Sequence, residues 1–200
     1  MTFCKLFFNY RQRRLYLNRM KNRKKKLTNI AFVILIGLML YPPTKVYFIR
    51  LISFSPSIVK EANQKIVSGF NWQLKGLNTN DIDLKSLEGK VVFVSFWATW
   101  CGPCIAEMPS IKKLYADYKD KVAFILVTNE NWQTVSTFYT KKGFDFPTYN
   151  QGSIGPKEFI SKTIPATFII NKNKKIVVEK RGPANWNSST TRKLLDNLLK

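Results

Sequence analysis

Histidine is absent from this chain of 200 residues, and cysteine occurs only three times. Without histidine there is no Ser–His or Cys–His nucleophile pair, no imidazole ligand for a metal and no histidine-ligated haem. Acidic residues are scarce too, because 12 of them stand against 33 lysines and arginines, for a formal net charge of +21. The length is sufficient for one core-forming domain with appendages but not for two ordinary domains.

The positive charge is concentrated at the N-terminus. Residues 1–27 contain ten basic residues and no acidic one, whereas the other 23 basic residues face all 12 acids and leave +11 over residues 28–200. Such a run is typical of a tail rather than of a folded surface. We interpret residues 1–27 as a topology signal that contacts anionic lipid. No base-reading motif accompanies it, so nucleic acid is not an expected partner.

An apolar run, IAFVILIGLML, occupies residues 30–40. No small-x-small cleavage site follows closely, and apolar residues resume over 46–49, so roughly twenty residues can cross a bilayer. We therefore predict a retained signal anchor over residues 28–49. The positive-inside rule then places the basic tail in the cytoplasm and the rest of the chain outside, at the cell membrane with a single pass.

The remaining chain shows a change of pattern near residue 70. Residues 50–69 are weakly patterned and are expected to form a linker. Farther on, strands are predicted over 71–77, 90–98 and 121–129, helices over 102–120, 131–143 and 188–200, and a β-hairpin over 166–182. Strand and helix alternate and then give way to a hairpin and a helix, which predicts one three-layer α/β domain with a mixed sheet over residues 70–200.

Cys101 and Cys104 are separated by Gly102 and Pro103, and three interpretations of the pair compete. A zinc site needs four ligands, but the domain has one cysteine pair and no histidine. A structural disulfide across two intervening residues would close too short a loop to constrain the unfolded chain much.

The third interpretation is a redox-active dithiol, and the position of the pair favours it. The cysteines follow the strand predicted over 90–98 and begin the helix predicted over 102–120. Amide N–H groups and the helix dipole at this place favour a thiolate at Cys101, the attacking species in disulfide exchange. Cys104 lies one turn farther along and is suited to resolving a mixed disulfide. We favour the working dithiol.

The segment VVFVSFWATWCGPCIAEMP (residues 91–109) resembles the thioredoxin superfamily. Together with the predicted anchor and TIPATFIIN (residues 163–171), it is most similar to the TlpA/ResA-type membrane-anchored thiol–disulfide oxidoreductases. The resemblance covers residues 70–200. It implies a thioredoxin fold, with a mixed central sheet flanked by helices and preceded by one N-terminal transmembrane helix.

The resemblance also implies roles for individual residues. Cys101 matches the exposed nucleophile and Cys104 the resolving cysteine. Pro165 matches a cis-proline whose loop faces the dithiol and pairs with the substrate backbone, which makes Ile164, Pro165 and Trp100 the expected substrate-binding residues.

One position departs from the cytosolic thioredoxins, which hold a buried aspartate six residues before the first cysteine, where this chain has Ser95. Glu107 instead lies three residues past Cys104, on the same helical face, as in the ResA-like branch. We predict that Glu107 exchanges a proton with Cys104. The alternative is an ordinary solvated helix glutamate.

The expected function is therefore the reduction of disulfides in exported proteins, such as apocytochrome c, outside the membrane. A membrane electron donor of the CcdA/DsbD type is expected to regenerate the dithiol, with no metal and no dissociable cofactor. The Gly102–Pro103 pair favours a reductant, because strong oxidants of the superfamily usually hold a histidine there. A disulfide oxidase or isomerase, and a tethered client-binding module with an incidental dithiol, remain the alternatives.

Overall fold

The computed structural model describes residue 19, residues 24–38 and residues 42–200. Most of the predicted basic tail, and residues 39–41 within the predicted anchor, lie outside these described residues. Residues 24–38 are helical and exposed. Across the part of the chain that is described, none of the helices is both long and apolar enough to cross a membrane. The chain divides into two compact units at residues 45 and 46, and the second unit contains every site residue predicted from the sequence.

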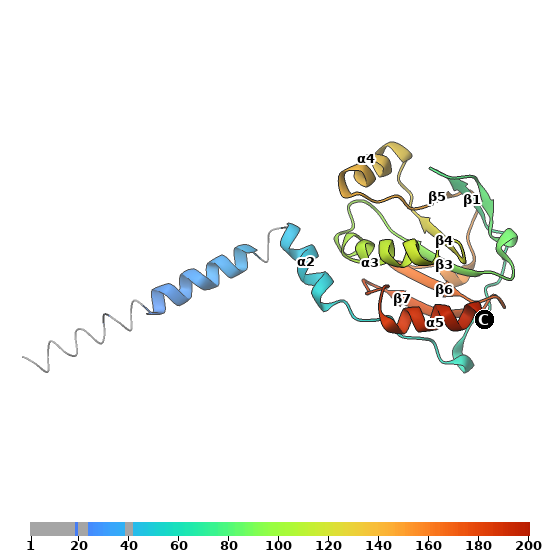
Figure 1. Cartoon of the computed structure of the whole chain (residues 1–200). Coiled ribbons are helices and arrows are strands. Elements are labelled where there is room, and N and C mark those ends of the chain that lie inside the picture. Colours follow the sequence, from blue (N-terminus) through green and yellow to red (C-terminus); the bar gives the residue numbers. More distant parts are fainter. Residues whose placement is uncertain (1–18, 20–23, 39–41) are drawn as a thin grey trace, which may run out of the picture. The chain divides into compact units, whose positions relative to one another are not determined.

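Strands and helices alternate from residue 73 onward, much as the sequence predicts (Figure 1). The α-helices from residue 42 onward are α2 (Pro42–Ile52), α3 (Gly102–Tyr118), α4 (Trp132–Lys142) and α5 (Ser189–Leu199). The strands are β1 (Gln73–Gly76), β2 (Ile82–Asp83), β3 (Val91–Phe96), β4 (Val122–Val127), β5 (Thr148–Gln151), β6 (Ala166–Ile170) and β7 (Ile176–Arg181). Three short 3-10 helices complete the set: η1 (Glu61–Asn63), η2 (Leu84–Leu87) and η3 (Lys157–Phe159).

The strands form one mixed sheet in the order β2-β1-β5-β4-β3-β6-β7. β3 lies inside the sheet, parallel to β4 and antiparallel to β6. Its β-branched and aromatic side chains are buried on both faces, which is why this segment reads as a continuous apolar run. Because β3 and β6 are antiparallel, the end of β3 at Phe96 pairs with the start of β6 at Ala166. The loop that leads to Cys101 and the loop that contains Pro165 therefore meet at one edge of the sheet.

One face of the sheet is covered by α3, α4 and α5. Met108 and Leu114 of α3, Val135 of α4 and Leu195 of α5 belong to one buried cluster with Phe93 of β3. The chain moves in the same direction across the sheet from β3 to β4 and from β4 to β5, and each pair of strands is parallel. Because crossover connections between parallel strands are right-handed, α3 and α4 lie on the same face of the sheet.

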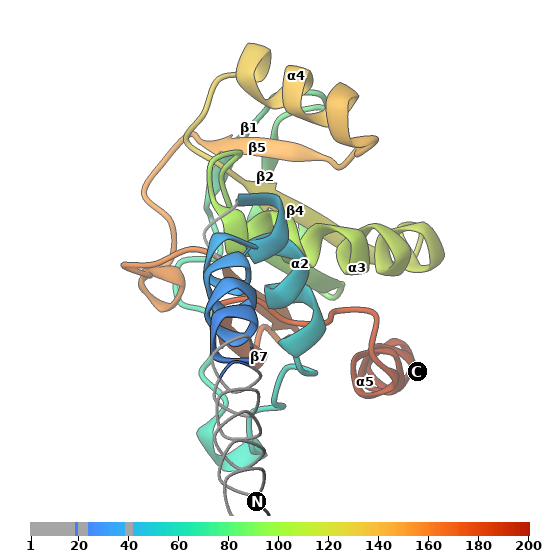
Figure 2. The ribbon, with the colours of Figure 1, turned by 90° about the vertical axis from the view of Figure 1, so that its left-hand side faces the viewer.

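The other face is covered by shorter elements. Trp72, Leu84 of η2 and Phe159 of η3 pack there against Val94 and Phe168. Figure 2 shows the segment around η3 and helix α5 on opposite sides of the strands. The expected mixed sheet flanked by helices is confirmed, and on this second face the helices are 3-10 turns rather than α-helices.

Residues 50–69, predicted as a linker, are held against the last strand. The backbone N–H of Val67 donates to the carbonyl of Lys174, and that of Ile176 donates to the carbonyl of Lys65, both at 2.9 Å. The Val67 side chain is buried. This segment covers the outer edge of β7, whose amide groups would otherwise be left to pair with another chain.

Candidate active site

Cys101 and Cys104 form a disulfide at the start of α3. Cys101 is the N-cap of the helix, and its Sγ accepts a hydrogen bond from the backbone N–H of Cys104 at 3.2 Å. In the reduced protein the same N–H and the helix dipole favour negative charge on the Cys101 sulfur.

The exposure of Cys101 differs from the exposed nucleophile that the resemblance implies. The residue is only 4% exposed and Cys104 only 1%. Both belong to the buried cluster that contains Trp97 and Ala98, so in the disulfide form the protein packs around the pair.

Two tryptophans near the dithiol have different environments. Trp97 is buried, and its ring stacks on Tyr139 of α4 at a centroid distance of 5.6 Å. Trp100, directly before Cys101, is 75% exposed. Trp100 therefore leaves a large apolar ring open to solvent beside the cysteines, whereas Trp97 packs beneath the loop.

The Pro165 loop lies beside this surface. The Ile164–Pro165 peptide bond is cis, as the resemblance implies. The carbonyl of Pro165 accepts a hydrogen bond from the N–H of Gly182 at 2.8 Å, which ties the loop to the end of β7. Ile164 and Trp100 line the same hollow, so the structure brings two of the predicted substrate-binding residues together.

Glu107 is buried in α3, one turn beyond Cys104, with 2% of its surface exposed. Its Oε2 accepts hydrogen bonds from the indole N–H of Trp186 at 2.9 Å and from the backbone N–H of Ala184 at 3.1 Å. Its Oε1 has no hydrogen-bond partner among the described residues. The alternative of a solvated helix glutamate is therefore wrong.

Burial determines the charge of this carboxyl. It raises the pKa of Glu107 from 4.5 to about 8, although the hydrogen bonds from Trp186 and Ala184 and the charge of Lys180 act in the opposite direction. A group with this pKa is mostly protonated at neutral pH and can still release its proton. At the position of the thioredoxin aspartate, Ser95 is paired with the hydroxyl of Thr167 at 2.9 Å.

A hollow in two adjoining parts lies beside the loop that leads to Cys101, and neither cysteine is among its lining residues. Its first part, about 290 Å³, includes Trp100 and Glu130, and its second part, about 310 Å³, includes Ile154 and Ile160. The two parts share Phe96, Asn129, Gln151 and Ile164. Ile154 and Ile160 are strongly exposed in the second part and Trp100 in the first, so each part has an apolar rim.

The redoxin family profile matches residues 59–199. This chain belongs to the redoxin family. The match begins within residues 50–69, in agreement with the hydrogen bonds that hold that segment to β7. In the described part of this redoxin, no group of three or more histidine, cysteine, aspartate or glutamate residues is placed to hold a metal ion.

Curated relatives carry the name thiol-disulfide oxidoreductase ResA. One from Halalkalibacterium halodurans is 37% identical over 110 residues, which cover 54% of this chain and 62% of the relative. One from Bacillus thuringiensis is 36% identical over 110 residues, 54% of this chain and 64% of the relative. The matched part thus spans less than two thirds of the length of these relatives.

A solved structure shares the fold. It is described as a putative thiol:disulfide interchange protein DsbE from Chlorobium tepidum, and it superposes with a TM-score of 0.57 at 22% sequence identity. The superposition covers 68% of this chain and 99% of that chain. At this identity the likeness supports the thioredoxin-like arrangement of the redoxin domain.

Glu130 is a site residue that sequence reasoning missed. Its carboxylate accepts hydrogen bonds from the backbone N–H and from the hydroxyl of Thr99, both at 2.6 Å. Thr99 lies two residues before Cys101, so Glu130 holds the loop that leads to the cysteine pair. The signal in the sequence was its place three residues after the end of β4, because the carboxyl ends of neighbouring parallel strands meet at one edge of a sheet.

Proposed function

We propose that this redoxin is a thiol–disulfide oxidoreductase that reduces disulfides in other proteins. The observation that carries the proposal is the Cys101–Cys104 pair at the N-terminus of α3, with Trp100 exposed beside it. The relatives named thiol-disulfide oxidoreductase support the same activity.

In the proposed reaction the reduced protein supplies two electrons. The Cys101 thiolate attacks one sulfur of a client disulfide, a mixed disulfide forms, and the client's other sulfur leaves as a thiolate that takes a proton from water. Cys104 then loses its proton and attacks the Cys101 sulfur. The mixed disulfide breaks, the Cys101–Cys104 disulfide forms, and the client leaves with two thiols.

Glu107 is proposed to exchange the proton of Cys104. With a pKa of about 8, Glu107 has an ionised fraction near neutral pH, and that carboxylate can accept a proton from a residue one helical turn away. During resolution the ionised carboxylate takes the proton. When the disulfide is reduced again, the protonated carboxyl, which predominates at neutral pH, returns a proton to the Cys104 sulfur.

The hollow beside the dithiol is proposed to hold the client. Trp100 and Ile164 offer apolar contacts near the sulfur atoms, and the cis-Pro165 loop lies where a client backbone can approach. An extended segment with a bulky apolar side chain near its cysteine fits the apolar rim at Ile154 and Ile160.

We further propose that clients are exported proteins, with apocytochrome c as an example, and that a CcdA/DsbD-type membrane donor returns the dithiol to its reduced form. Two sequence features support a location outside the cell membrane: the basic residues 1–27 and the apolar run over residues 30–40. The Gly102–Pro103 pair supports reduction as the direction of electron flow.

A trapping experiment tests the activity. Cys104→Ser leaves the nucleophile but removes the resolving sulfur, so mixed disulfides with clients are expected to accumulate and to dissolve on adding dithiothreitol. Cys101→Ser with Cys104→Ser is the matched control, and it is expected to trap nothing. Equal recovery of partners by both variants would instead identify a client-binding module whose dithiol is incidental.

A further inference from the structure

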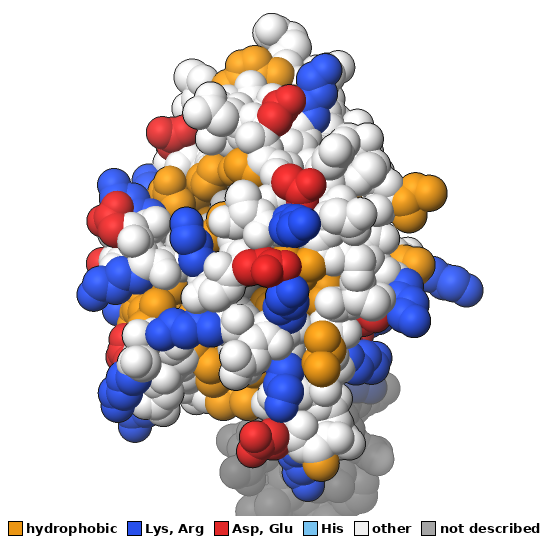
Figure 3. All heavy atoms as spheres, turned by 90° about the vertical axis from the view of Figure 1, so that its right-hand side faces the viewer, with side chains coloured by type: hydrophobic (Ala, Val, Ile, Leu, Met, Phe, Trp, Pro, Cys, Tyr) orange, Lys and Arg blue, Asp and Glu red, His pale blue; other side chains and the backbone are white. Residues whose placement is uncertain are grey.

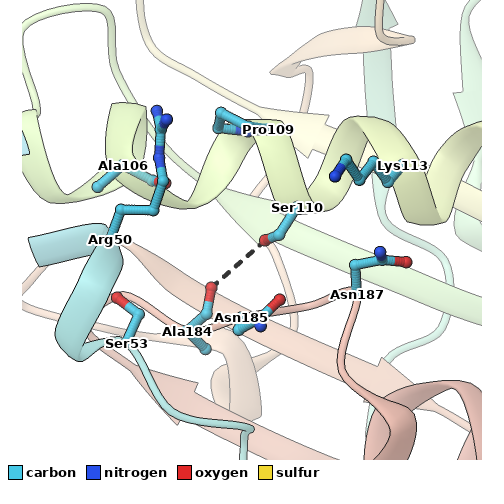
Figure 4. A pocket seen from close by; sticks show the side chains of 9 residues that line it. All are labelled: Arg50, Ser53, Ala106, Pro109, Ser110, Lys113, Ala184, Asn185 and Asn187. Carbon is cyan, nitrogen blue, oxygen red and sulfur yellow. Dashed lines mark hydrogen bonds between the residues drawn. The ribbon is translucent and has the colours of Figure 1, made fainter. Parts of the chain in front are cut away.

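A second hollow lies away from the dithiol, where α2, α3 and the loop from β7 to α5 come together (Figure 4). Its volume is about 310 Å³. The polar side chains around it are Arg50, Ser53, Ser110, Lys113, Asn185 and Asn187. No carboxylate lines it, although it is large enough for a small ligand.

Among the described residues, neither cation of this hollow has an ion-pair partner. The ion pairs of the described residues involve Lys65, Lys174, Arg181 and Arg192, but neither Arg50 nor Lys113. The guanidinium of Arg50 makes one long hydrogen bond, of 3.4 Å, to the carbonyl of Ala106. On the face in Figure 3, acidic side chains lie among the lysines and arginines, whereas none lines this hollow. The hollow therefore places two cations from different segments around one space with no acidic residue in its lining.

The amides of the loop add donors rather than acceptors. Asn187 Oδ1 accepts two hydrogen bonds from Arg192, at 2.9 Å and 2.6 Å, so the Nδ2 group of Asn187 is left to donate. The side chain of Asn185 is exposed and makes no hydrogen bond within the described structure. An anion in the hollow would meet a guanidinium, an ammonium and carboxamide N–H groups.

The wall of the hollow is held in place by buried contacts. The backbone N–H of Trp186 donates to Ser110 Oγ at 3.0 Å, and the backbone N–H of Ala184 donates to Glu107 at 3.1 Å. These bonds fix the loop from β7 to α5 against α3. A ligand that binds here needs little ordering of the backbone, and only the exposed side chains of Arg50 and Lys113 have to be ordered around it.

We propose that this hollow is a binding site for a phosphate-class oxyanion. A tetrahedral anion presents several acceptor oxygens in different directions, and the planar fork of Arg50 and the point charge of Lys113 approach from different segments. A free phosphate and the phosphodiester of a lipid headgroup carry the same charged oxygens. The site is independent of the dithiol chemistry, although it shares the loop that holds Glu107.

Titration of the full chain with inorganic phosphate, at constant ionic strength in a neutral detergent, tests the site by ¹⁵N NMR. We expect saturable shifts of the side-chain amides of Asn185 and Asn187. Arg50→Gln and Lys113→Gln are each expected to weaken binding about tenfold, since each removes a charge-assisted hydrogen bond. Lys112→Gln is the matched control, because its neighbouring ammonium bonds to the Gly143 carbonyl outside the hollow, and its binding is expected to be unchanged.

A parallel titration with glycerophosphoglycerol, a soluble phosphodiester headgroup, identifies the source. Tighter binding of the diester supports the site and assigns it to a lipid headgroup, and tighter binding of inorganic phosphate supports it as a site for a free anion. Shifts that grow linearly without saturation for both probes would overturn the proposal. Saturable shifts that persist in both Arg50→Gln and Lys113→Gln would overturn it as well.

Discussion

Replacing Glu107 with glutamine tests whether burial controls the charge of this carboxyl. At 1.36 kcal/mol per pKa unit, the rise in the pKa of Glu107 from 4.5 to about 8 corresponds to about 5 kcal/mol of folding free energy. The folded chain keeps the proton up to about pH 8, whereas the unfolded chain releases it above about pH 4.5. The folded state therefore binds more protons in this window, and its stability falls as the pH rises.

Glutamine cannot titrate, so the variant lacks this dependence. Between about pH 5.5 and about pH 7, the free energy of unfolding of the wild type is expected to fall by about 2 kcal/mol relative to Glu107→Gln. Denaturant unfolding of the oxidised proteins measures this difference. The indole N–H resonance of Trp186, which donates to Glu107, is expected to titrate with a midpoint near 8.

Glu158→Gln is the control for removing a carboxylate. Desolvation raises the pKa of Glu158, but the hydrogen bonds from Ser68 and from its own backbone and the charge of Lys157 together outweigh it. The net pKa is lowered, so Glu158 stays ionised throughout the window in both states. Parallel stability curves for the wild type and Glu107→Gln would refute the reasoning. They would mean that the carboxyl reaches solvent and titrates near its ordinary value.

Three further predictions concern the supports of the site. Trp186→Phe removes the hydrogen bond to Glu107 and is expected to lower the free energy of unfolding by about 2–4 kcal/mol, measured by denaturant unfolding. The pKa of Glu107 is expected to rise further, which the pH dependence of that free energy measures. Glu130→Ala is expected to slow disulfide exchange about tenfold, because it frees the loop before the cysteines from Thr99. Glu158→Ala removes the two hydrogen bonds from Ser68 and is expected to leave the rate unchanged. A variant without residues 1–69 is expected to have a free energy of unfolding about 3–6 kcal/mol lower than a variant without residues 1–45, because the edge of β7 is uncovered and the contacts of buried Val67 are lost. Equal melting curves of the two variants would contradict this prediction.

The local structure around the dithiol could be predicted because its signals are local. The apolar run of β3 and the Gly102–Pro103 start of α3 are contained in one short segment. The end of α4 is likewise set by Gly143, which adopts a left-handed conformation with φ of 67°. Each of these features depends on neighbours within a few positions.

The environment of Glu107 could not be predicted in the same way. Helical spacing places it on the face of Cys104, but its burial depends on Trp186 and Ala184, which follow it by 79 and 77 positions. The hydrogen bonds of Glu130 to Thr99 cross 31 positions and follow from the parallel pairing of β3 with β4. Such contacts are consequences of topology, which a local pattern does not contain.

The attachment of residues 50–69 was missed for a related reason. The segment has no regular apolar period because it pairs through backbone groups and buries only isolated side chains, such as Val67. A pattern of hydrophobic residues predicts helices and strands that bury a whole face. It does not predict a segment that lies along a sheet edge and pairs through its backbone.

The reduction potential of the Cys101–Cys104 pair, measured by equilibration against thiol–disulfide buffers, tests the proposed reductant most directly. We expect a value at or below that of thioredoxin, about −270 mV, so that the dithiol gives electrons to client disulfides. A value near about −120 mV, that of a strong oxidant, would contradict it and make the protein a disulfide donor.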